Sequence, residues 1–256
     1  MLSLSSPLLT YWPSPITWAE EDHFISGLGA ITGRGTASGT GESSAELAST
    51  VAGHPGIWKL ACGTASASIA SLGFPGLLSF ANTDGKYAFR SIISPQSLFS
   101  AGNTGQLFWG FGNTMVAGTA PTSGFYFQYD TALSASIPYA VVAGAGTLSQ
   151  ASGVTLVGTS WYDSMIVVDN AALTVEFYLT LALTAAASAN GQYPSYGTPV
   201  ATFSMPSNQS GGLQAGITTI KGASGSTSVS TYIDYWGLFF SGGPATMEGM
   251  SLQSVN

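Results

Sequence analysis

The feature that most constrains the fold of this chain is an alternating apolar pattern within residues 160–183. Two runs rich in β-branched and aromatic residues, 161–168 and 173–181, flank Asp-Asn-Ala-Ala at 169–172, and this arrangement predicts a β-hairpin. In the second run the apolar side chains stand at odd positions, which predicts one face toward a core and one toward solvent. The first run is apolar at 165–168 and predicts a central strand covered on both faces.

Similar segments recur along the chain. Residues 232–240, read YIDYWGLFF, are also rich in aromatic and β-branched residues, and we expect them to join the sheet that holds the hairpin. The other expected strands lie within 54–62, 64–72, 77–81, 87–93, 107–112, 125–129, 139–142, 199–205, 217–221 and 226–240. No apolar stripe of helical period persists over three turns, so the sequence predicts one large all-β domain, a sandwich.

The chain is expected to divide into three parts. Residues 1–19 predict an extended N-terminal arm, because prolines fix φ and remove backbone donors. Within this arm Trp12, Pro13, Pro15 and Trp18 are the candidate anchors for packing onto the parent domain or a neighbour. Residues 20–241 form the expected β-sandwich domain, and residues 242–256 are expected to form a C-terminal tail, with a second arm as the alternative.

The charge content is low. Only 7% of residues are Asp, Glu, Lys or Arg, against roughly a quarter in ordinary globular proteins. Free monomers usually keep apart through surface charge. We therefore expect neighbouring subunits to cover much of the surface, in a homo-oligomer such as a closed trimer. The alternative is a secreted protein with a neutral coat rich in Ser and Thr.

Charge and hydropathy also exclude some partners. The net charge is −7 and no basic cluster is present, which argues against a nucleic-acid partner. No window contains 18 or more consecutive apolar residues, and the N-terminal segment lacks the basic start of a signal peptide. We expect a soluble chain without a membrane partner.

No catalytic site, metal site or cofactor is expected. Glycosidases need two carboxyl groups close together, whereas Glu176 and Asp234 each stand alone in an expected strand. The two histidines, His23 and His54, accompany no nucleophile elbow, and the single cysteine, Cys62, is expected to be a buried apolar residue. The 33 glycines show no phosphate-binding spacing.

Carbohydrate is the most credible small ligand. Tyr193 and Tyr196 lie in a segment rich in Pro and Gly, and exposed aromatic rings can stack on sugar faces. The alternative is that both rings cover the loop or a seam between subunits. Asp169 and Asn170 could in principle touch calcium, but the chemistry of a hairpin turn explains them fully.

Several segments together resemble bacteriophage virion structural proteins with a concanavalin A-like (lectin/glucanase) jelly-roll domain. They read EEDHFISG, HPGIWKLACGT, Gly110-Phe111-Gly112, GFYFQYD, SWYDSMIVVDNAALTVEFYL and YIDYWGLFF, and they span most of residues 20–241. The resemblance implies a jelly-roll β-sandwich of two antiparallel sheets. In such domains a strand with a leading Trp pairs with a strand ending in Phe-Tyr.

The resemblance also implies a role. We expect a bacteriophage structural protein located in the virion, on the head surface rather than in a tail fibre. It would act as a capsid decoration (cement) subunit that stabilises the head through contacts with the major capsid protein or other virion subunits. The alternative is a tail fibre or spike, or a lectin-like carbohydrate-binding module, that attaches to a surface glycan of the host.

Overall fold

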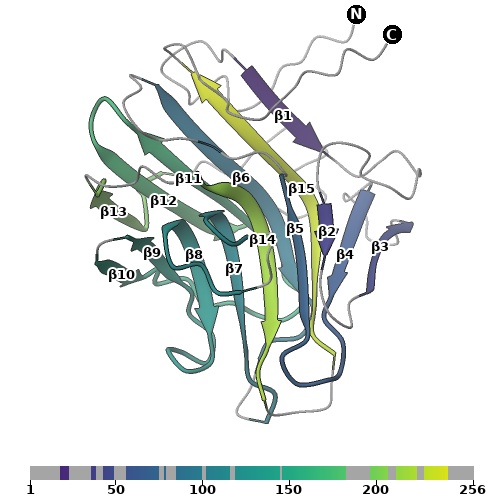
Figure 1. Ribbon diagram of the computed structural model, residues 1–256. Coiled ribbons are helices and arrows are strands. Elements are labelled where there is room, and N and C mark those ends of the chain that lie inside the picture. The colour runs from purple at the N-terminus through teal and green to yellow at the C-terminus, as the bar shows by residue number, and fades with distance from the viewer. Residues whose placement is uncertain are drawn as a thin grey trace, which may run out of the picture.

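The computed structural model describes twelve parts of the chain. They are residues 18–22, 36–38, 43–48, 56–74, 78, 85–99, 102–115, 119–144, 146–182, 197–206, 212–223 and 228–241, with the backbone alone described up to residue 48. Every regular element in these parts is a β-strand, and the strands form two antiparallel sheets that face each other (Figure 1). The predicted all-β sandwich of two antiparallel sheets is confirmed.

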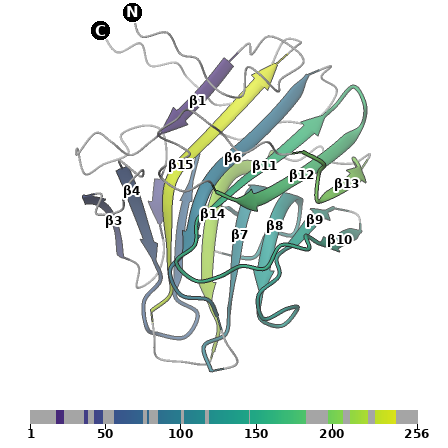
Figure 2. The same ribbon diagram turned by 180° about the vertical axis from the view of Figure 1, so that it is seen from behind.

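The larger sheet has eight strands. Its order is β13-β12-β11-β6-β15-β4-β3, and β1 also pairs with β15. The bounds are β1 Trp18–Asp22, β3 Ser43–Ala48, β4 Gly56–Ala61, β6 Lys86–Pro95, β11 Tyr162–Asp169, β12 Thr174–Leu181, β13 Ala201–Ser204 and β15 Ser230–Ser241. In both views β15, β6, β11 and β12 run side by side (Figure 2).

The second sheet has seven strands in the order β10-β9-β8-β7-β14-β5-β2. The bounds are β2 Thr36–Ser38, β5 Ile69–Gly73, β7 Gly105–Gly112, β8 Gly124–Asp130, β9 Tyr139–Ala143, β10 Thr147–Ala151 and β14 Gln214–Lys221. Neighbouring strands of this sheet pair antiparallel. Its central strands come from residues far apart in sequence, because β14 lies between β7 and β5.

The hairpin predicted from the alternating pattern is present as β11 and β12, with Asp169 opposite Thr174. Val175 and Phe177 are fully buried, as the odd positions predicted. Leu173 differs, because its side chain is 61% exposed and its φ is 53°. The turn therefore continues through Leu173, and the strand begins one residue later than its apolar pattern indicated.

The predicted central strand is also confirmed. β11 lies between β12 and β6, and both of its faces carry apolar residues: Ile166 and Val168 belong to the main core, while Met165 and Val167 belong to a cluster on the other face. The segment 232–240 joins the same sheet as part of β15, separated from β11 only by β6.

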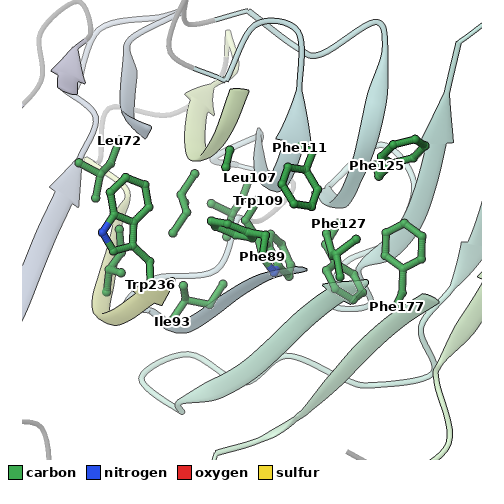
Figure 3. Packing of buried hydrophobic residues seen from close by; sticks show 14 of the residues in the cluster. Leu72, Phe89, Ile93, Leu107, Trp109, Phe111, Phe125, Phe127, Phe177 and Trp236 are labelled. Atoms are coloured by element: carbon green, nitrogen blue, oxygen red, sulfur yellow. The ribbon is translucent and has the colours of Figure 1, made fainter. Parts of the chain in front are cut away.

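The core between the sheets is aromatic. The indole of Trp109 in β7 stacks on Phe127 in β8 at a centroid distance of 5.1 Å, and Phe127 meets Phe177 of the opposite sheet edge-on at 5.3 Å. The indole N–H of Trp109 donates to the hydroxyl of Ser164 across the core at 3.0 Å, so this buried donor has a hydrogen-bond partner. Figure 3 shows the three rings together.

Two expectations about the ends of strands are revised. Residues 64–72 were expected to form a strand throughout, but β5 begins at Ile69. The preceding residues form a turn in which the N–H and hydroxyl of Ser68 both donate to the carbonyl of Ala65, at 3.2 and 2.7 Å, and Ala67 has a φ of 57°. Trp18, expected within the arm, is the first residue of β1.

Candidate ligand-binding face

The outer face of the seven-stranded sheet carries the clearest grouping of polar and aromatic side chains among the described residues. On β7 the residues Leu107, Trp109 and Phe111 point into the core. The alternate residues Gln106 and Phe108 therefore point outward. On β8 and β9 the outward positions are held by Tyr126, Gln128, Asp130 and Tyr139, as the pairing of the three strands requires.

Gln106, Gln128 and Asp130 form a hydrogen-bonded cluster, here called the Gln–Asp cluster. The Nε2 of Gln106 donates to Oδ2 of Asp130 at 2.6 Å, and the Nε2 of Gln128 donates to the same oxygen at 3.2 Å. The other carboxylate oxygen accepts the N–H of Ala132 at 2.8 Å. Gln106 lies directly opposite Asp130 in the ladder, so the pairing of β7 and β8 builds the cluster.

This cluster sets the direction of both glutamine amides. An ionised carboxylate only accepts hydrogen bonds, so the NH₂ end of each amide must face Asp130. The two Oε1 atoms are then the ends left to accept hydrogen bonds from elsewhere. Asp130 is buried, at 7% exposure, whereas Gln106 and Gln128 are half-buried and can be reached from outside.

Apolar and aromatic side chains surround the Gln–Asp cluster. The rings of Phe108 and Tyr126 meet edge-on at 5.7 Å and are buried in an outer cluster of the sheet. Tyr139 of β9 and Ile220 of β14 pack against this cluster and remain half-buried. Tyr139 lies directly opposite Gln128, so a partly accessible ring stands beside an amide that presents an acceptor.

The connection between β7 and β8 limits this face at one end. Its Met115 is fully buried, and a Cβ on Gly112 would lie 2.9 Å from Pro121, so the connection packs closely on the sheet. The hydroxyl of Tyr126 donates to the carbonyl of Pro121 at 3.0 Å. Burial raises the pKa of Tyr126 to about 12, so this donor keeps its proton through neutral pH.

The outer face of the eight-stranded sheet is different in character. Its apolar cluster contains Ala88, Met165, Tyr235 and Phe239, with Ile92, Val167 and Tyr178 packed against it. Within it Arg90 and Asp163 form a buried ion pair. The guanidinium donates from Nε at 3.1 Å and from Nη2 at 2.6 Å to the two carboxylate oxygens, and it lies 5.2 Å from the ring centre of Tyr235.

Two other acidic residues on this sheet also have specific partners. Asp169 forms an ion pair with Lys86 at 2.6 Å and accepts the N–H of Ala172 at 3.0 Å. Burial tends to raise the pKa of Asp169, but the hydrogen bond from Lys86 and those from the backbone outweigh it and hold the pKa below its usual value. Glu176 accepts the hydroxyl of Tyr178 at 2.7 Å.

Four described acidic side chains each have a partner of their own. Asp130 accepts from Gln106, Asp163 from Arg90 and Glu176 from Tyr178, and Asp169 forms an ion pair with Lys86. Within the described part of the chain, no group of three or more His, Cys, Asp or Glu side chains could hold a metal ion. The same residues include no helix long and apolar enough to cross a membrane.

Most residues proposed from sequence lie outside the described parts of the chain. This holds for Trp12, Pro13, Pro15, Tyr193 and Tyr196. The backbone of Trp18 is described and pairs with that of Phe240.

Cys62 is buried, at 1% exposure, as the sequence predicted. Its thiol donates to the carbonyl of Val229 at 3.3 Å. Burial raises the pKa of the thiol despite this bond and the nearby positive charge of Lys221.

The Gln–Asp cluster was not proposed from sequence. The alternation of Tyr126 and Gln128 with Phe125, Phe127 and Tyr129 was a usable signal, because it marks the outward positions of β8. The same rule applied to β7 marks Gln106.

No protein-family model matches the chain, and no curated protein matches its sequence. Solved structures match its fold. A protein of unknown function from Shewanella oneidensis MR-1 has a TM-score of 0.58 at 15% identity, over 94% of this chain and 95% of that one. The seed lectin of Lotus tetragonolobus has a TM-score of 0.55 at 9% identity, over 88% and 98%. The carbohydrate recognition domain of Emp47p has a TM-score of 0.54 at 13% identity, over 88% and 96%. At these identities the likeness shows the fold alone, and that fold is the concanavalin A-like β-sandwich of lectins.

Proposed function

We propose that the protein is a lectin-like module that binds neutral carbohydrate on the outer face of its seven-stranded sheet. The observation that carries the proposal is the Gln–Asp cluster beside Tyr139: two oriented amide oxygens next to a partly accessible ring. A sugar offers hydroxyl donors at its rim and C–H groups on its faces, so it fits acceptors placed beside an aromatic ring. The lectin-type fold supports the same function.

The charge of the cluster favours a neutral ligand. Asp130 is buried and its carboxylate already accepts three hydrogen bonds. Its negative charge remains close to the two glutamines and opposes the approach of a sulfated or carboxylated sugar. We also propose binding without turnover, because Asp130, Asp163, Asp169 and Glu176 are each held by a separate partner.

Binding to a glycan array tests the proposal. The purified chain is expected to bind neutral oligosaccharides, and Tyr139→Ala is expected to lower the affinity about three- to tenfold through loss of the stacking ring. Tyr178→Ala is the matched control, because Tyr178 is a half-buried tyrosine on the outer face of the other sheet. Equal loss of binding in both variants, or no binding by the parent chain, would contradict the proposal.

A second candidate function is a structural subunit of a bacteriophage virion, either a head decoration protein or a fibre component. It is favoured by the low charge of 7% and by the apolar cluster on the outer face of the eight-stranded sheet. The named solved structures with a stated activity are lectins, so the carbohydrate-binding function has more support. Co-sedimentation with purified capsids that lack the protein, in the presence and absence of the array-selected sugar, separates the two candidates.

A further inference from the structure

The open edge of β10 has an unusual set of properties. This strand is the last of the seven-stranded sheet and pairs, among the described strands, with β9 alone. All five of its side chains are exposed. Its sequence, TLSQA, contains no charged residue and no proline. An open strand edge can add a further strand through backbone hydrogen bonds.

The other sheet edges carry features that discourage such pairing. β1 contains three acidic residues in five positions, and β3 contains Glu46. β2 is only three residues long. β13 is four residues long and lies between Pro199 and Pro206. Among the described edges, β10 alone has neither charge nor flanking proline over a length of five residues.

The hydrogen bonds to β9 show which backbone groups of β10 point outward. The N–H of Gly144 donates to the carbonyl of Gly146 at 3.1 Å, and the N–H of Ser152 donates to that of Pro138 at 2.9 Å. Both pairs continue the register of the ladder. In an antiparallel ladder the hydrogen-bonded pairs alternate with non-bonded pairs. The even-numbered residues of β10 therefore bond to β9, and the N–H and C=O groups of Thr147, Ser149 and Ala151 point away from it.

We propose that this chain forms a twofold dimer in which β10 pairs antiparallel with β10 of a second copy, centred on Ser149. Only this register pairs all three outward-pointing residues: Ser149 meets Ser149 of the partner subunit, and Thr147 meets Ala151 of the partner subunit. Three such pairs give about six backbone hydrogen bonds. The two seven-stranded sheets become one continuous sheet.

Self-pairing suits this edge better than an unrelated peptide does. The outward backbone groups of Thr147, Ser149 and Ala151 are evenly spaced about Ser149, so a second copy of β10 offers matching groups at all three positions. With a net charge of −7 on each chain, approach of two copies is least opposed where a strand carries no charge. A twofold contact closes the assembly at two subunits, in place of the trimer expected from composition.

Sedimentation velocity across a concentration series tests the dimer. The full chain is expected to reach twice its mass of 26.1 kDa. Ser149→Pro removes the outward N–H and no bond to β9, so two of the about six hydrogen bonds between subunits are lost. The dissociation constant should rise about 25-fold, at about 5-fold for each of the two bonds. Ser149→Thr keeps the N–H and is the matched control, with the dimer retained.

A charge exchange tests the register itself. Ser149→Lys and Ser149→Glu each place like charges opposite each other at the twofold axis, so each variant alone is expected to be monomeric. An equal mixture of the two should restore a dimer. A parent chain that stays monomeric at all concentrations, or a dimer unaffected by these variants, would overturn the proposal. So would a mixture of the charged variants that fails to associate.

Discussion

Removal of the carboxylate from the buried ion pair should be among the most destabilising single changes in the described sheet. In Asp163→Leu the guanidinium of Arg90 loses two hydrogen bonds, of 3.1 and 2.6 Å. The side chain of Arg90 is only 6% exposed and that of Asp163 is 1% exposed. Water therefore cannot replace the carboxylate unless the surrounding side chains move apart. Breaking one side of such a pair costs about 3–5 kcal/mol of unfolding free energy.

Urea unfolding of a double-mutant cycle measures this effect. Arg90→Met and Asp163→Leu are made singly and together, and each free energy of unfolding is extrapolated to zero urea. Because the double variant leaves no charge inside the apolar cluster, we expect its stability to lie within about 2 kcal/mol of the parent. A loss below about 1 kcal/mol in Asp163→Leu, or single losses that simply add, would refute the reasoning.

Three further predictions concern other parts of the fold. In Asp130→Asn the amide oxygen is expected to keep the hydrogen bond from the N–H of Ala132, which turns the new NH₂ group toward both glutamines, because both donate to Oδ2. Both glutamine amides must then reverse, and glycan affinity measured by calorimetry should fall about tenfold. An unchanged affinity would exclude the amide oxygens from binding. Gly124→Ala should lower the free energy of unfolding, measured by thermal denaturation, by about 3 kcal/mol or more. The reason is that the φ of Gly124 is +139° and a Cβ would lie 2.1 Å from the carbonyl oxygen of Phe111. Gly146→Ala is the control, because the space around Gly146 is open. The pKa of Asp169 is lowered in the folded protein, so the stability that Asp169 contributes is complete above its unfolded pKa and is lost as pH falls through the folded pKa. The difference in unfolding free energy between the parent and Asp169→Asn should therefore shrink below about pH 4. A difference that stays constant with pH would contradict this.

The strands that could be predicted from sequence are those whose side chains are sorted by burial. β11 and β12 carry long apolar runs because they lie within a sheet, and the pattern identified both strands and the turn between them. β10 was not predicted, although it pairs with β9 along its full length. Its five side chains are all exposed, so no core imposes an alternation on its sequence.

The candidate site could be predicted only in part, because it depends on pairing between strands. Local alternation places Gln106 and Gln128 on outward positions of β7 and β8. It does not show that Gln106 lies opposite Asp130, which is 24 residues later in the chain. The same limit applies to Arg90 and Asp163, which are 73 residues apart and meet only because β6 pairs with β11.

Sugar binding at the outer face of the seven-stranded sheet is tested most directly by a crystal structure with an array-selected neutral oligosaccharide. The bound sugar is predicted to lie across β7, β8 and β9, with its hydroxyls donating to Oε1 of Gln106 and Gln128 and a ring face against Tyr139. A sugar bound on the outer face of the eight-stranded sheet, or at any position that leaves these three side chains untouched, would contradict the account.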